Sequence, residues 1–171
     1  NSEDSRFWGF VPDENIVGTL DEGFIHMMTW LPQERLGSAV TNLAHARQIL
    51  DETLGYVKER HAFGQAVGQF QHNKFLVADL VTRVEVTQAY VDQCILALNA
   101  GELTPAQAAQ AKYWCTDLQN RATDRCLQLF GGYGYMSEYP IARAYVDARV
   151  TSIYGGTNEV MKTIIAKSLG L

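Results

Sequence analysis

The sequence predicts an all-α fold, a bundle of three long helices with one or two shorter ones. Three observations carry this prediction. Apolar residues recur with a helical period over long stretches, breaks containing Gly or Pro separate these stretches, and no alternating strand pattern of convincing length is present. The 171 residues suffice for one domain with a core, and 47% hydrophobic and 19% charged residues are typical of a globular protein.

Charge and composition exclude several classes of function. A formal net charge of −5 argues against nucleic acid as a partner. No apolar run approaches the roughly 20 residues of a membrane span. No secretory signal begins the chain, so we expect a protein that is not secreted. Neither the cysteines nor the histidines have metal-ligand spacing, so we expect no metal site and buried free thiols. These residues are Cys94, Cys115, Cys126, His26, His45, His61 and His72.

The start of the chain predicts a short leading segment. Residues 1–20 are polar and mixed, and the helical bundle domain is expected over residues 21–171. Asp21 is suited to cap a short helix whose apolar stripe begins at Phe24. Pro32 is expected to kink that helix or to open the next one at a first-turn position.

Residues 33–58 predict a long helix with a heptad seam. Leucines or valine recur at every seventh position, which is typical of a helix packed on other helices. The seam residues are Leu36, Leu43, Leu50 and Val57, with Val40 and Leu54 interleaved and Ala39 and Ala46 beside them.

The rest of the chain alternates loops and helices. Residues 59–71 lose the apolar stripe and read as loops, and a second long helix is expected over residues 73–100. Thr104 and Pro105 predict the start of a third helix, which stops at residues 131–132. A shorter helix is expected from Ile141 to about residue 151. Thr157 or Asn158 then caps a last helix.

The residue patterns alone give little chemistry. Taken by itself, Glu34 is better explained as an exposed first-turn acid that the helix dipole favours than as a functional residue. The glycine-rich breaks after Phe130 and Tyr154 present backbone N–H groups suited to anions or carbonyl oxygens. Because these breaks flank one short helix, they could line one site, although neither is a phosphate-loop or dinucleotide fingerprint.

Three blocks in this order resemble the C-terminal helical domain of the acyl-CoA dehydrogenase family. The first is residues 59–65 (Glu-Arg-His-Ala-Phe-Gly-Gln) with 69–71 (Gln-Phe-Gln). The second is residues 128–135 (Gln-Leu-Phe-Gly-Gly-Tyr-Gly-Tyr) with 138–140 (Glu-Tyr-Pro). The third is residues 147–149 (Asp-Ala-Arg) with 153–159 (Ile-Tyr-Gly-Gly-Thr-Asn-Glu). The resemblance implies a four-helix-bundle-like, up-down C-terminal domain, and residues 11–18 resemble the strand that leaves the family's β domain.

The resemblance also implies a reaction. The family uses FAD to remove the α proton and the β hydride of an acyl-CoA thioester, as in fatty acid β-oxidation. Many members place the base Glu where this chain has Gly155. The long-chain and isovaleryl-type branches instead place it in a Glu-Arg pair at the head of the long helix. Glu34 and Arg35 match that pair, and residues 31–36 are most like the long-chain branch. The implied substrate side consists of Arg35, Gly155 and Gly156.

The resemblance points to flavin contacts and partners as well. The implied FAD-binding residues are Arg60, Phe63, Gln71, Gln128, Leu129, Phe130, Gly131, Gly132, Thr157, Asn158 and Glu159. Several of them reach the flavin of a neighbouring subunit in the family, which implies a homodimer or homotetramer. The expected partners are an acyl-CoA substrate and an electron-transfer flavoprotein as acceptor. The expected location is the cytoplasm in a bacterium or the mitochondrial matrix in a eukaryote.

Two alternatives stay open at this point. The chain could be a non-catalytic helical oligomerisation module without flavin, or it could belong to an acyl-CoA oxidase. We expect these 171 residues by themselves to bind FAD poorly and to turn over nothing, because the domain that covers the flavin ring in the family is not among them. The sequence leaves acyl chain length and branching open.

Overall fold

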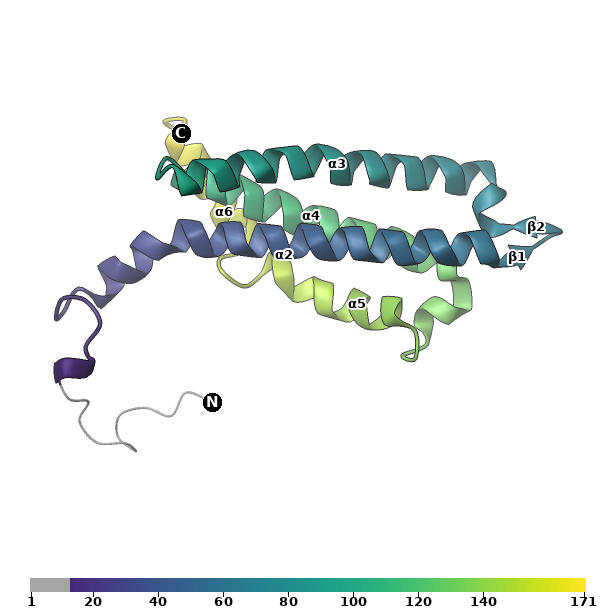
Figure 1. Ribbon diagram of the computed structural model, residues 1–171, viewed down its shortest axis with the longest axis horizontal. Coiled ribbons are helices and arrows are strands. Elements are labelled where there is room, and N and C mark those ends of the chain that lie inside the picture. The colour runs from purple at the N-terminus through teal and green to yellow at the C-terminus, as the bar shows by residue number, and fades with distance from the viewer. Residues whose placement is uncertain (1–12) are drawn as a thin grey trace. The chain divides into compact units, whose positions relative to one another are not determined.

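The computed structural model describes residues 13–171 and is almost entirely helical (Figure 1). The elements are η1 (Asp13–Asn15), α2 (Gly23–Glu59), β1 (His61–Ala62), β2 (Gln65–Ala66), η2 (Val67–Gln69), α3 (Gln71–Asn99), α4 (Pro105–Phe130), η3 (Gly131–Tyr135), α5 (Pro140–Ala148), η4 (Arg149–Ser152) and α6 (Asn158–Ser168). The chain divides into two compact units that meet between Leu31 and Pro32, and each is described by itself.

In the first unit, the described residues form a 3-10 turn and the beginning of α2. Residues 13–15 form the 3-10 turn. The resemblance of residues 11–18 to the strand that leaves the family's β domain stays a prediction, and its residues 11–12 lie outside the described residues. Asp21 does not cap the helix, because it has a left-handed φ of 66° and α2 begins two residues later at Gly23. The Thr19 N–H donates a hydrogen bond of 3.1 Å to Nε2 of His26.

Pro32 neither ends a helix nor opens one. It lies inside α2, which runs over 37 residues, so of the two expectations for Pro32 the start of a new helix is wrong. A proline within a helix lacks the N–H that would bond the carbonyl four residues earlier, here that of Met28. The boundary between the two units in the sequence falls at this proline.

The core of the second unit is shared by the inner faces of α2, α3, α4 and α5. The heptad leucines of α2 are 2–3% exposed, which confirms the predicted seam. The interleaved positions differ from the prediction, because Ala39, Ala46 and Thr53 are buried whereas Val40 is 39% exposed. Small side chains at these positions let neighbouring helices approach closely, and the larger Val40 is displaced to the outer side of the seam.

Short hydrogen-bonded elements join the long helices. Residues 61–66 were expected to form a loop, but β1 and β2 pair antiparallel with His61 opposite Ala66. Phe63 and Gly64 both have positive φ, 50° and 83°, as a two-residue hairpin turn requires. Figure 1 shows this hairpin at the ends of α2 and α3.

The start of α4 confirms the predicted cap. The Thr104 hydroxyl accepts a hydrogen bond from the Gln107 N–H, and the Gln107 side chain accepts one from the Thr104 N–H. This reciprocal pair is a capping box, followed by Pro105 at the first helical position. Thr157 caps α6 in the same way, by accepting a bond from the Val160 N–H. Within the described part of the chain, no helix is long and apolar enough to cross a membrane.

All three cysteines are free and buried, as predicted. Burial raises the pKa of Cys115 to about 12, so its reactive thiolate is scarce at pH 8. Burial also raises the pKa of Cys94 and Cys126. We therefore expect a thiol reagent at pH 8 to label none of the three in the folded chain and all three in concentrated guanidinium chloride. Rapid labelling of the folded chain would contradict this burial.

Candidate active site

Glu34 lies at the mouth of a small pocket on the second unit. The pocket has a volume of about 220 Å³ and is lined by Glu34, Arg35, Ser38, Lys112, Tyr154 and Gly155. The first three come from α2, Lys112 comes from α4, and the last two come from the turn before α6. Glu34 is exposed in this chain, so the pocket by itself does not shield the carboxylate from water.

Two cations lie beside this carboxylate. Burial lowers the pKa of the Arg35 guanidinium, and the charge of Glu34 acts in the opposite direction. Arg35 Nε is buried without a hydrogen-bond partner among the described residues. Burial also lowers the pKa of Lys112, and the charge of Arg35 lowers it further. The pocket thus combines one accessible carboxylate with two buried or partly buried cationic side chains, Arg35 and Lys112.

The turn opposite Glu34 presents bare backbone. Gly155 and Gly156 have φ values of 63° and 100°, which favour glycine. A Cβ on Gly156 would lie 2.7 Å from Cε of Met161, so the end of that side chain would have to move to admit one. No hydrogen-bond partner is found for either glycine N–H among the described residues. Such free N–H groups are suited to hold a carbonyl oxygen.

A second pocket of about 520 Å³ lies at the other glycine-rich segment. It is lined by Tyr56, Arg60, Val67, Gln128, Leu129, Phe130, Gly131, Gly132, Tyr133 and Met136. The Arg60 guanidinium lies 5.2 Å from the centroid of the Tyr133 ring. An exposed cation held over an aromatic face, beside glycine backbone, is suited to a diphosphate.

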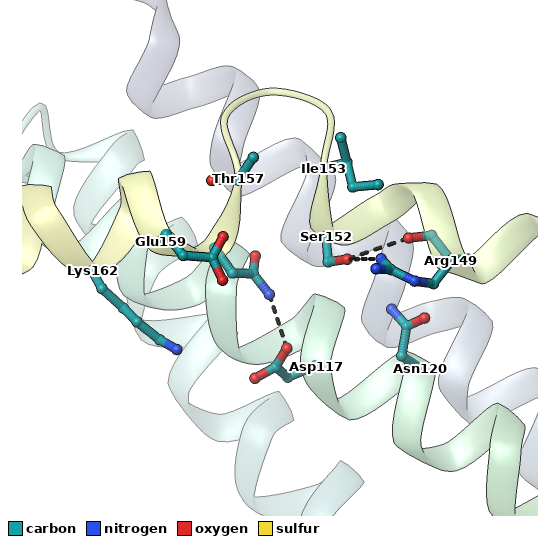
Figure 2. A pocket seen from close by; sticks show the side chains of 9 residues that line it. Asp117, Asn120, Arg149, Ser152, Ile153, Thr157, Glu159 and Lys162 are labelled. Atoms are coloured by element: carbon teal, nitrogen blue, oxygen red, sulfur yellow. Dashed lines mark hydrogen bonds between the residues drawn. The ribbon is translucent and has the colours of Figure 1, made fainter.

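The last three implied flavin residues line a third pocket of about 400 Å³, shown in Figure 2. Thr157 and Glu159 stand at the start of α6, opposite Asp117 and Asn120 of α4. Asn158 is 5% exposed, and its side chain bonds Lys112, Thr116 and Asp117 in the interior. This side chain is therefore engaged within the protein, and the flavin contact of Asn158 stays a prediction.

Phe63 and Gln71 lie outside the linings of these three pockets. Phe63 is 97% exposed at the tip of the β1–β2 hairpin, with its ring edge toward Phe70. Gln71 is the exposed first residue of α3. Both are accessible to a partner surface.

Comparison with known proteins identifies the family. Residues 21–170 match the family described as "Acyl-CoA dehydrogenase, C-terminal domain". The chain is 46% identical over 159 residues to the mitochondrial long-chain specific acyl-CoA dehydrogenase of Sus scrofa, covering 93% of this chain and 37% of that protein. This chain belongs to the acyl-CoA dehydrogenase family.

Solved structures of family members share its fold. An acyl-CoA dehydrogenase from Geobacillus kaustophilus superimposes with a TM-score of 0.90 at 42% identity, covering 94% of this chain and 42% of that one. Butyryl-CoA dehydrogenase from Megasphaera elsdenii superimposes with a TM-score of 0.89 at 36% identity. The all-α prediction and the resemblance to the family's C-terminal domain are confirmed. The chain spans about two fifths of the length of these relatives.

In this family member, the two glycine-rich breaks do not line one site. Gly155 faces the pocket of Glu34, whereas Gly131 and Gly132 line the pocket of Arg60. Helix α5 and turn η4 stand between them and hold them apart by roughly 20 Å of helix length. In Figure 1, α5 follows the segment after α4 at one end and leads to the loop before α6 at the other. The expectation of a single shared site is therefore wrong.

Sequence reasoning missed Lys112, Ser38 and Tyr154 as pocket-lining residues. Lys112 is four residues after Ala108 and three before Cys115, both of which belong to the predicted buried stripe of α4. A lysine at such a position must be buried or must distort the packing. Its place within the apolar stripe is therefore the sequence feature that could have identified Lys112.

Proposed function

We propose that this chain is the C-terminal helical domain of an FAD-dependent acyl-CoA dehydrogenase, with residues 21–171 forming the bundle and Glu34 acting as the base. The observation that carries the proposal is the pocket that Glu34 and Arg35 share with Gly155, which lies far from them in the sequence. A base and a carbonyl-binding turn across one small pocket suit proton removal next to a thioester carbonyl.

In this reaction the Glu34 carboxylate takes the proton from the α carbon of the acyl-CoA. The N–H groups of the Gly155–Gly156 turn donate hydrogen bonds to the thioester carbonyl oxygen and stabilise the negative charge that grows on it. FAD, when bound, supplies the acceptor for the hydride that leaves the β carbon. Arg35 places a positive charge beside Glu34 at this pocket. Since Glu34 is exposed here, exclusion of water depends on the bound thioester and on protein beyond these residues.

The residues of the second pocket fit a flavin dinucleotide. Arg60 and the glycine backbone at 131–132 would hold the diphosphate, with Gln128 beside them. Thr157 and Glu159 would approach the cofactor from the third pocket. Because the two pockets lie at opposite ends of α5, we propose that each serves a different flavin, as expected in a homodimer or homotetramer.

Three finer features belong to the same proposal: the acyl group, the electron acceptor and the location. The long-chain relative and the likeness of residues 31–36 favour a long-chain or branched acyl group in fatty acid β-oxidation. An electron-transfer flavoprotein is the proposed acceptor, and the location would be the mitochondrial matrix or the bacterial cytoplasm. A caffeyl-CoA reductase–Etf complex subunit of Acetobacterium woodii is 35% identical over 159 residues, which is consistent with such an acceptor.

The test is the visible spectrum of the complete protein that contains this chain. We expect bound flavin that loses its absorbance when acyl-CoA is added without oxygen, most rapidly with long or branched acyl chains. Residues 1–171 alone are expected to retain no flavin after gel filtration, because the ring would be exposed to water. A complete protein without flavin would favour the non-catalytic helical module instead. Flavin reoxidised rapidly by oxygen would identify an oxidase.

A further inference from the structure

Lys112 is an unusual residue to find inside a helical bundle. It is 0% exposed and is the largest of the fully buried side chains. Taking an ammonium group out of water costs several kcal/mol unless hydrogen bonds replace the lost hydration. Lys112 Nζ donates to the carbonyl oxygen of Gly156 at 2.9 Å and to Oδ1 of Asn158 at 3.3 Å. Both acceptors belong to the turn that connects η4 to α6.

The rest of this network also ties α4 to the turn. The Thr116 hydroxyl donates to Oδ1 of Asn158 at 3.1 Å. Nδ2 of Asn158 donates to Oδ1 of Asp117 at 2.8 Å, a bond that Figure 2 shows as a dashed line. These bonds fix Asn158 at the first position of α6. Within residues 13–171, Lys112 is the one side chain that donates a hydrogen bond to the Gly156 carbonyl.

The surroundings of Lys112 disfavour its positive charge. It lines the Glu34 pocket together with Arg35, and the two cations oppose one another. The charges of Asp117 and Glu159 offset part of this repulsion. A well-packed apolar side chain would commonly stabilise a buried helix interface at least as well as a buried charge. The lysine is therefore better explained by what it does to the turn than by stability alone.

The turn needs an external support. Gly155 and Gly156 have the freedom of glycine, and their N–H groups have no partner among the described residues to hold them in place. The Gly156 carbonyl bond to Lys112 fixes the peptide plane that follows Gly156, while Met161 and Arg35 limit the space around its Cα. Removing the bond would leave the turn free to rotate away from Glu34.

We propose that Lys112 is a positioning residue that holds the Gly155–Gly156 turn against the Glu34 pocket, so that the backbone N–H groups of the turn face the thioester oxygen. Its part in the reaction rests on the proposed function above. Its effect on the turn does not, because that effect follows from the hydrogen bonds within this chain.

The first test is amide hydrogen exchange in the chain itself. Lys112→Met keeps the length of the side chain and removes its charge and donors. We expect the hydrogen-bonded amides on either side of the two glycines, those of Ile153, Tyr154, Val160 and Met161, to exchange roughly 10-fold faster or more. The amides of Leu80 and Val84 in α3 should keep their rates. Thr123→Val is the matched control, since Thr123 is buried on the same helix and bonds only its own helix at Gln119.

Lys112→Gln serves as a second variant, because it keeps a donor and is the milder change if the methionine chain does not fold. It should accelerate exchange at the amides of Ile153, Tyr154, Val160 and Met161 by a smaller factor than Lys112→Met. Equal acceleration at all amides, or none in the turn, in the folded variant would show a merely structural role and would overturn the inference.

The second test uses the complete protein. Lys112→Met should lower kcat for acyl-CoA dehydrogenation by about 10- to 100-fold, with flavin content unchanged and KM changed much less. Loss of flavin, or an equal loss in KM, would contradict positioning at the thioester. If the unaltered complete protein reduces no flavin with acyl-CoA, the proposed function fails while the exchange result still decides the effect on the turn.

Discussion

Glu34→Gln in the complete protein should lower the rate of flavin reduction by acyl-CoA by at least about 100-fold while flavin content is unchanged. Gln has nearly the shape of Glu and cannot accept a proton at neutral pH. Glu34 is the carboxylate that lines the pocket with Gly155, and Ser38 and Tyr154, the uncharged side chains beside it, cannot replace it. The measurement is anaerobic stopped-flow absorbance at saturating acyl-CoA.

The matched control is Glu52→Gln on the same helix. Glu52 is exposed and its carboxylate accepts a bond from Gln48, away from the three pockets described above. It should leave the rate unchanged, because an amide oxygen still accepts that bond. Flavin reduction by the Glu34→Gln protein at the original rate would remove Glu34 from its proposed role and return the search to the other groups at the pocket.

The helical period predicted the bundle because burial of one face repeats along every long helix. It placed Val40 in the core, although Val40 is 39% exposed. A simple period does not say at which positions beside the seam the side chains must be small so that the helices can approach each other. It also passed over Lys112, because a pattern built on apolar residues treats a lysine as a surface residue. The hydrogen-bond partners that make its burial tolerable lie 44 and 46 residues further along the chain.

The pairing of Glu34 with Gly155 was expected only from the resemblance to the family. Neither residue stands out locally, since one is a first-turn acid and the other a turn glycine. Their proximity depends on how α6 returns to the end of α4, which no periodicity encodes. The two glycine-rich breaks differ from this pair. They are close in sequence, which suggested one shared site, but α5 lies between them and they line different pockets.

Gly134→Ala should lower the stability of the chain by about 1–3 kcal/mol, which corresponds to a fall in Tm of roughly 3–10 °C for a domain of this size. An added Cβ would lie 2.6 Å from the backbone carbonyl oxygen of Leu127 and 3.1 Å from its Cγ. A backbone atom at the end of α4 cannot rotate away as a side chain can, so η3 has to move off the helix. Thermal unfolding followed by circular dichroism measures the effect.

Gly132→Ala, in the same 3-10 turn, separates this steric effect from any general need for glycine in η3. A Cβ there meets no atom within 4 Å, so its effect on stability should stay within about 0.5 kcal/mol. In the complete protein, Gly134→Ala should also weaken flavin retention, because η3 carries the glycine backbone that lines the Arg60 pocket. Equal Tm values for the two variants would mean that η3 is not packed on α4 at this distance. A loss of flavin with Gly132→Ala alone would instead place the cofactor against that exposed backbone, where a methyl group obstructs binding without disturbing the fold.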